Sequence, residues 1–247
     1  MARGQGKPGA GSSGRRPDGR QVRWDQHKLE RRRQIVDAAI ELIEEQGADS
    51  EVHVVQIAER AGMVRTVVYR HFTDRADLDD AVQERVVEML RERLDPQVTL
   101  EGSIEEIILR IVTAYVTWAA GHPELHRLVG RAAGDRPMSS AIDGVASQVQ
   151  SLVRLAAEIL EVDLPEEMSQ SLDPFVFGIV GQAFATVGRW VSRPTLEPDA
   201  ATYSRLFARS VWYQIDGHLR SIGVEFDPTV DVTELTLTAM ATRAGGR

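Results

Sequence analysis

The sequence predicts an all-α protein in which a small N-terminal helical domain is joined by a connecting helix to a larger C-terminal helical bundle. Apolar side chains recur at three- and four-residue spacings along the strong segments, which is the pattern of amphipathic helices. No segment shows a convincing alternation of polar and apolar residues, the mark of a half-buried strand. With 43% hydrophobic and 27% charged residues over 247 positions, the chain has the composition of a globular protein and enough length to bury a substantial core.

The first predicted helix starts at about Gln26 and stops at Gly47, a residue type that commonly follows a helix end. Two short helices follow, at 54–60 and 65–72, on either side of a turn at 61–63. The apolar stripe of the first helix comprises Ile35, Ala38, Ala39, Leu42 and Ile43. Residues 26–75 are therefore predicted to form one small helical domain, preceded by a basic extension at 1–25.

The connecting helix is expected to begin after Thr73 or Asp74, either of which can cap it, and to stop before Pro96. Ser103 and Glu106 have the spacing of a capping box at the start of the next helix. The five later helices are expected at 103–121, 123–133, 138–162, 170–192 and 199–222. Residues 76–225 thus form the predicted bundle, and 226–247 are expected to be a partly loose tail.

Composition also excludes several classes of protein. The chain has no cysteine, which rules out a disulfide scaffold, a thiolate zinc site and a cysteine nucleophile. No uninterrupted apolar run approaches the ~20 residues of a membrane span. The N-terminus is basic but lacks the apolar core and cleavage site of a signal peptide. We therefore expect a cytoplasmic protein.

Charge is spread unevenly along the chain. Residues 1–33 carry ten basic and three acidic side chains (+7), whereas the remainder carries 19 basic and 34 acidic ones (−15). Such asymmetry favours a local contact with a polyanion over a globally basic binding surface. Residues 1–25 are rich in Gly, Ser, Pro and Arg and are expected to be disordered. The alternative is a solvated tail that contacts nothing.

The stretch from Ile57 to Phe72 has the features of a helix-turn-helix. Ala58 is small where a second helix would cross the first, and Gly62 lies in the turn. The expected inner face consists of Ile57, Ala61, Met63 and Val68. The side chains that then point outward are Val64, Arg65, Thr66, Tyr69 and Arg70. Arginine can bond guanine bidentately and threonine can touch a thymine methyl, so this surface suits the major groove of DNA. The alternative is an ordinary helical hairpin with surface arginines.

Residues 30–90 resemble the N-terminal domain of the tetracycline-repressor (TetR) family of transcriptional regulators. The resemblance rests on "RRRQIVDAAIELIEEQG", "VVQIAERAG", "VVYRHFTDRADL" and the helix that follows. It implies a homodimer that binds a palindromic operator on double-stranded DNA. Carried over by position, Arg65 and Thr66 would face bases, whereas Tyr69, His71 and Arg75 would lie near phosphates. The side-chain chemistry of Arg70 also suits a phosphate contact. The departures are Arg75 for a usual lysine, Val64 for a frequent serine cap, and His53 for a common phosphate-binding threonine.

The resemblance also implies a C-terminal domain that binds a small-molecule effector and dimerises through its last two long helices. The candidate effector residues are Tyr115, Trp118, His122, Phe177 and Gln182. The candidate dimer residues are Phe175, Gly181, Phe184, Trp190, Phe207 and Trp212. The alternative in both cases is that these side chains fill the core of one protomer. His122 and His126 are four residues apart, but Pro123 interrupts the helix there, so we expect no metal site.

Two classes of function follow. The first is a ligand-responsive transcriptional regulator, most simply a repressor that blocks polymerase, released or modulated by an apolar effector such as a fatty-acyl compound or hydrophobic drug. The second is a helical ligand-binding protein or enzyme whose helix-turn-helix no longer binds DNA. No phosphate loop, nucleophile triad or paired-carboxylate motif stands out, so we expect no enzymatic activity and no cofactor.

Overall fold

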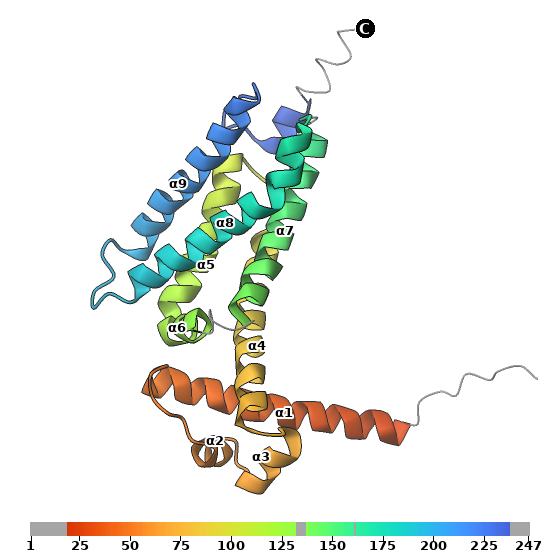
Figure 1. Cartoon of the computed structure of the whole chain (residues 1–247), viewed down its shortest axis with the longest axis vertical. Helices are drawn as coiled ribbons and strands as arrows, with labels where there is room; N and C mark the ends of the chain where they lie inside the picture. Colours follow the sequence, from red (N-terminus) through yellow and green to blue (C-terminus); the bar gives the residue numbers. More distant parts are fainter. Residues whose placement is uncertain (1–18, 132–136, 161, 238–247) are drawn as a thin grey trace, which may run out of the picture.

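The computed structural model describes residues 19–131, 137–160 and 162–237, and these ranges form an all-α architecture with no named strand (Figure 1). A small domain at one end is connected by the long helix α4 to an elongated bundle at the other (Figure 1). The α-helices are α1 (Gly19–Gln46), α2 (Val54–Arg60), α3 (Arg65–His71), α4 (Arg75–Leu94), α5 (Ile104–Gly121), α6 (Pro123–Arg131), α7 (Pro137–Ile159), α8 (Glu166–Val191) and α9 (Ala200–Ser221).

The small domain is built on the apolar stripe of α1. Ile35, Ala39 and Leu42 are at most 5% exposed and pack in one core with residues of α2, α3 and α4. Gly47 follows α1 with a φ of +89°, a conformation that glycine adopts without the clash a Cβ would cause. The predicted stripe and its glycine stop are therefore confirmed.

Helix α1 begins earlier than the sequence indicated. It starts at Gly19 rather than near Gln26, so residues 19–25 of the expected disordered extension are helical. Residues 1–18 lie outside the described residues. The apolar periodicity that predicts helices is weak before Ile35, which explains why the start was missed.

Local capping signals set the starts of two other helices as predicted. The Asp74 side chain accepts a hydrogen bond from the Asp77 amide at 2.9 Å and caps α4. Ser103 and Glu106 form a reciprocal capping box at α5, with N···O distances of 2.9 and 3.3 Å. Because each cap satisfies amides that the first helical turn leaves free, the helix starts are fixed locally.

The bundle consists of two closely packed pairs of helices, α5 with α9 and α7 with α8, and α6 lies at its lower end (Figure 1). Part of the tail expected to be loose is docked on it. The Pro228 carbonyl accepts from the Glu105 amide at 3.0 Å, and the Val232 amide donates to the Gly102 carbonyl at 3.1 Å. Val232 is 5% exposed, so this segment closes over the start of α5. Residues 238–247 lie outside the described residues.

The two domains also touch through the start of α6. His122, just before α6, lies 2.5 Å from the Glu44 carboxylate on α1. Glu124 accepts a hydrogen bond from the Ala48 amide at 2.7 Å, just after the end of α1. These contacts give the bundle a second connection to the small domain besides α4.

Candidate DNA-binding surface and regulatory bundle

The α2–α3 unit is a tight helix-turn-helix. The Met63 amide donates to the Ala58 carbonyl at 2.8 Å and the Gly62 amide to the Glu59 carbonyl at 3.0 Å. Gly62 has a φ of +67°, in the left-handed region that favours glycine. Of the predicted inner face, Ile57, Ala61 and Val68 are at most 4% exposed, whereas Met63 is half-buried.

Helix α3 is fixed at its C-terminal end by α1. The Arg32 guanidinium donates to the His71 carbonyl at 2.7 Å and to the Asp77 carboxylate at 3.2 Å. The same guanidinium lies 4.1 Å from the centre of the Phe72 ring, which is 1% exposed. The Thr73 amide and Arg32 donate to Asp77, and these hydrogen bonds lower the pKa of its carboxyl. This cluster anchors a helix of only seven residues, which would not be stable alone.

Helix α2 is anchored to α1 by a second arginine. Arg60 donates to Glu45 at 2.6 and 2.9 Å and to Glu41 at 3.2 Å. Gln34 adds a hydrogen bond of 3.0 Å to the Ala61 carbonyl at the end of α2. Arg32 and Arg60 thus bind α3 and α2 to α1 through hydrogen bonds and ion pairs. Their charges are engaged within the helix-turn-helix domain.

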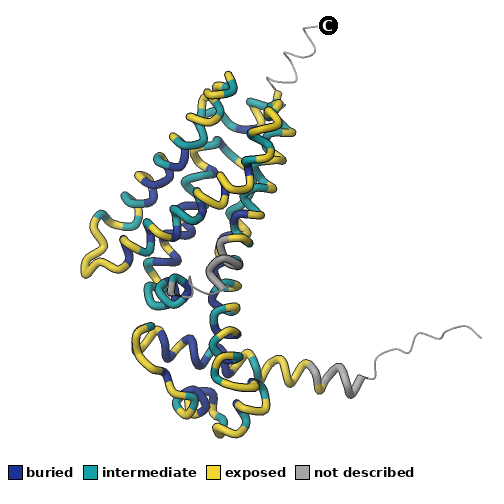
Figure 2. Tube along the Cα trace, in the orientation of Figure 1, coloured by how far each residue is buried: buried dark blue, intermediate teal, exposed yellow. Residues whose placement is uncertain are grey.

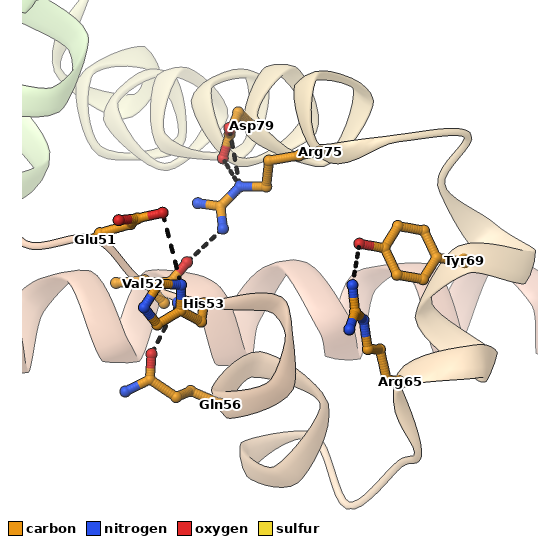
Figure 3. A network of polar contacts seen from close by, with 8 residues as sticks. All are labelled: Glu51, Val52, His53, Gln56, Arg65, Tyr69, Arg75 and Asp79. Carbon is orange, nitrogen blue, oxygen red and sulfur yellow. Dashed lines mark hydrogen bonds and ion pairs between the residues drawn. The ribbon is translucent and has the colours of Figure 1, made fainter.

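The outer face of α3 presents the side chains that the sequence placed there. Val64 is 65% exposed, Tyr69 is 41% exposed, and Arg65, Thr66 and Arg70 are also exposed. The Arg65 guanidinium donates to the Tyr69 hydroxyl at 3.4 Å and lies over its ring (Figure 3). Val64 gives α3 no side-chain cap, as expected from the loss of serine there. The arrangement offers base-contacting and phosphate-contacting groups on one short helix.

Arg75 and His53 lie at the neighbouring edge of the domain. Arg75 donates to the Asp79 carboxylate at 2.8 and 2.9 Å and to the Val52 carbonyl (Figure 3). It therefore ties the start of α4 to the segment before α2, and the Nη2 group of its guanidinium remains the donor through which it could also reach a phosphate. His53 is exposed, and its amide is capped by the Gln56 side chain at 2.8 Å.

His71 is half-buried, unlike the exposed side chains on the outer face of α3. Its Nδ1 atom is buried without a hydrogen-bond partner among the described residues. Burial, followed by the positive charges of Lys28, Arg32 and Arg31, lowers the pKa of the imidazole. Both effects favour the neutral imidazole, so a bond from His71 to phosphate would come from a neutral N–H group.

The predicted effector residues do not gather around one cavity. Tyr115 and Trp118 are 6% and 7% exposed in the core, whereas Phe177 is 38% exposed on α8. His122 contacts Glu44 of the small domain, and the Gln182 side chain accepts from Gln214 on α9 at 3.0 Å. A surface groove of about 640 Å³ opens beside the start of α5, and none of these five residues lines it.

His126 lies at a buried polar centre of the bundle, whereas the sequence analysis considered it mainly as a partner of His122 in a metal pair. This residue is 4% exposed, and its Nε2 atom lies 2.7 Å from the Tyr115 hydroxyl. Its ring stacks on Phe184 with centroids 5.7 Å apart. Burial lowers the pKa of His126 to about 4 and raises that of Tyr115 well above its usual range. An isolated histidine on a helix gives no sequence signal that distinguishes this buried pair.

The structure places four of the six predicted dimer residues in the core of the protomer. Phe184, Trp190, Phe207 and Trp212 are between 2% and 9% exposed, which matches the alternative that they fill the core. The other two are accessible: Phe175 is 43% exposed, and a Cβ on Gly181 would meet no atom within 4 Å.

Helices α8 and α9 nevertheless expose apolar surface. The exposed side chains include Phe175, Phe177, Leu206 and Tyr213. Among the described residues, only α8 is long and apolar enough by composition to cross a membrane, and 22% of its most apolar window is buried in the protomer. One such helix is weak evidence for a span, and its open apolar face equally suits another protein surface.

Comparisons with known proteins agree with this geometry. The family model described as bacterial regulatory proteins, tetR family, matches residues 35–82. The uncharacterized HTH-type transcriptional regulator Rv0472c of Mycobacterium tuberculosis is 30% identical over 192 residues, which cover 74% of this chain and 76% of that protein.

Solved structures share the fold. A tetR-family transcriptional regulator from Streptomyces coelicolor has a TM-score of 0.62 at 20% identity, covering 86% of this chain and 89% of its own. The transcriptional regulator FadR from Bacillus subtilis, solved in complex with stearoyl-CoA, has a TM-score of 0.54 at 18% identity, covering 71% of this chain and 95% of its own. Together with the helix-turn-helix on the surface of the small domain, these matches show that the chain belongs to the tetR family of bacterial transcriptional regulators.

Proposed function

We propose that this regulator is a cytoplasmic homodimeric repressor that binds a palindromic operator and is released or modulated by an apolar effector. The observation that carries DNA binding is the outer face of α3, where Arg65, Thr66 and Arg70 are exposed on a helix anchored by buried Val68 and Phe72. Arg65 and Thr66 are assigned to bases, and Tyr69 and Arg70 to phosphates.

The homodimer is assigned to the exposed side of α8 and α9. Gly178, Gly181 and Ala185 recur at three- and four-residue spacings, so they share one face of α8 and permit close approach of a partner helix. Leu206 and Tyr213 supply apolar area on α9 and are 57% and 63% exposed. A twofold contact of this face with itself would cover the apolar surface that one protomer leaves open.

The response to effector is assigned to α6. On its inner side, His126 reaches Tyr115 and Phe184 in the core of the bundle, and at its start Glu124 holds the backbone after α1. A ligand that displaces the His126 ring would shift the same helix that contacts the reading domain. The largely apolar surroundings favour an apolar effector, and the complex of the fold relative FadR with stearoyl-CoA makes fatty-acyl compounds the first class to test.

Mobility-shift assays with the DNA upstream of its own gene and adjacent genes test this proposal. We expect a complex that survives excess random DNA, protects a palindrome, and weakens when a fatty-acyl-CoA is added. Binding to upstream and random DNA with equal affinity would reject the regulator proposal in favour of a helical protein that no longer reads DNA. Tight operator binding that no acyl compound alters would reject only the effector class.

A further inference from the structure

The first turns of α1 extend beyond the folded domain. In Figure 1 this end of the helix projects to one side, and Figure 2 shows its described part as exposed. Residues 26–31 are all exposed, and Trp24 is 64% exposed. The Arg32 guanidinium, bonded to the His71 carbonyl, reaches α3 from the point where this arm meets the domain. At 1.5 Å per residue, Trp24 lies about 12 Å beyond Arg32 along the helix axis.

The exposed arm carries a basic stripe on the side that faces the reading unit. Trp24, Lys28 and Arg31 are spaced by four and three residues and therefore share one face of α1. The next residue of that stripe is Ile35, which is fully buried in the helix-turn-helix core. Lys28 and Arg31 also lie close enough to lower the pKa of His71 at the end of α3. The two cations of the stripe thus lie near the C-terminal end of α3.

The charge of this segment identifies its partner. Residues 19–33 contain six basic and two acidic side chains in a chain whose net charge is −8. An unpacked helical extension gains little from propensity alone, so a polyanion that binds its exposed cations would stabilise it. Duplex DNA offers phosphates for the cations and a sugar or groove surface for the indole ring.

We propose that the first turns of α1, with Trp24, Lys28 and Arg31, form a second DNA-contacting element that binds backbone phosphates beside the half-site read by α3. This inference rests on the proposed function. In Figure 1 the arm points away from the side of the bundle where α9 lies. In a dimer paired through α8 and α9, the two arms would therefore point away from each other, toward the outer flanks of the operator.

Tryptophan fluorescence provides the first test, because Trp24 is a natural probe. The other three tryptophans, Trp118, Trp190 and Trp212, are at most 9% exposed, so acrylamide quenches mainly Trp24. We expect duplex DNA to protect this accessible fraction, and a Trp24→Phe variant to lose the protectable signal. Unchanged quenching at saturating DNA would overturn the proposal. Protection that instead rises with protein concentration in the absence of DNA would also overturn it, in favour of contact with a second copy.

Salt dependence provides the second test. Arg31→Ala and Lys28→Ala should each reduce the slope of log affinity against log salt by ~0.9, on upstream and random DNA alike. Arg154→Ala is the matched control, because Arg154 is an exposed arginine on α7 in the distant bundle, and its slope should equal the wild-type slope. Wild-type slopes in both arm variants would overturn the proposal. If the wild-type protein shows no sequence preference, the proposed function fails, but slopes and quenching on random DNA still decide whether the arm binds DNA.

Discussion

Mildly acidic pH should destabilise the bundle, because His126 is buried in its neutral form. The pKa of this buried imidazole is about 4 in the folded protein, against about 6.5 for an unperturbed histidine. Between these two values the unfolded chain binds a proton that the folded chain does not, so the free energy of unfolding falls as pH falls. The loss is complete below about pH 4, where both states are protonated. At 1.36 kcal/mol per unit, the full effect is of order 3 kcal/mol, of which about 2 kcal/mol appears between pH 7 and pH 5.

Urea denaturation followed by circular dichroism at pH 7, 6 and 5 measures this effect at one fixed protein concentration, because dimerisation would make stability concentration-dependent. His126→Gln is the matched variant, since glutamine does not titrate and can still bond the Tyr115 hydroxyl. Between pH 7 and pH 5, the free energy of unfolding of the variant should fall by about 2 kcal/mol less than that of the wild type, whatever the stability of the variant at pH 7. Equal losses in both proteins would show that His126 is not held neutral by burial.

Two further substitutions test the anchoring of α3 and the dimer face. Arg32→Ala removes the hydrogen bond to the His71 carbonyl, which is worth roughly 1 kcal/mol. Amide hydrogen exchange should therefore become faster in α3 and stay unchanged in α9, and an α3 that exchanges at the wild-type rate would contradict this anchoring role. A Cβ at Gly181 would meet no other atom of the protomer within 4 Å, so we expect Gly181→Leu to leave the thermal stability of the monomer intact but to abolish the dimer in light scattering and weaken operator binding. An intact dimer with full affinity would reject this face.

Local signals made much of the fold predictable. Asp74 and the Ser103–Glu106 pair fix helix starts through their own side-chain hydrogen bonds, and Gly47 and Gly62 mark places where the backbone needs positive φ. The exposed face of α3 also followed from sequence, because Val68 is the apolar residue that α3 turns to the core, which leaves the other side of this short helix outward.

Contacts between helices that are distant in the chain could not be predicted from the sequence. Apolar composition does not tell which face of α8 or α9 turns to its own core, so Trp190 and Phe207 were assigned to an interface although they are buried in the protomer. The pairing of Tyr115 with His126 depends on how α6 folds back on α5 after Pro123. The start of α1 at Gly19 could not be predicted because the apolar periodicity of the sequence is weak before Ile35.

The central claim is that α3 reads DNA sequence, and Arg65→Ala tests it most directly. Arg65 is exposed, and among the described residues its guanidinium contacts only the Tyr69 side chain, so the substitution should leave the fold intact. Losing one bidentate base contact should weaken binding to the operator by ~1–3 kcal/mol relative to binding to random duplex DNA of the same length. The measurement is a pair of binding isotherms on the two DNAs at one salt concentration. Equal losses on both would place Arg65 on phosphate, and no loss on either would contradict the account of α3 as the reading helix.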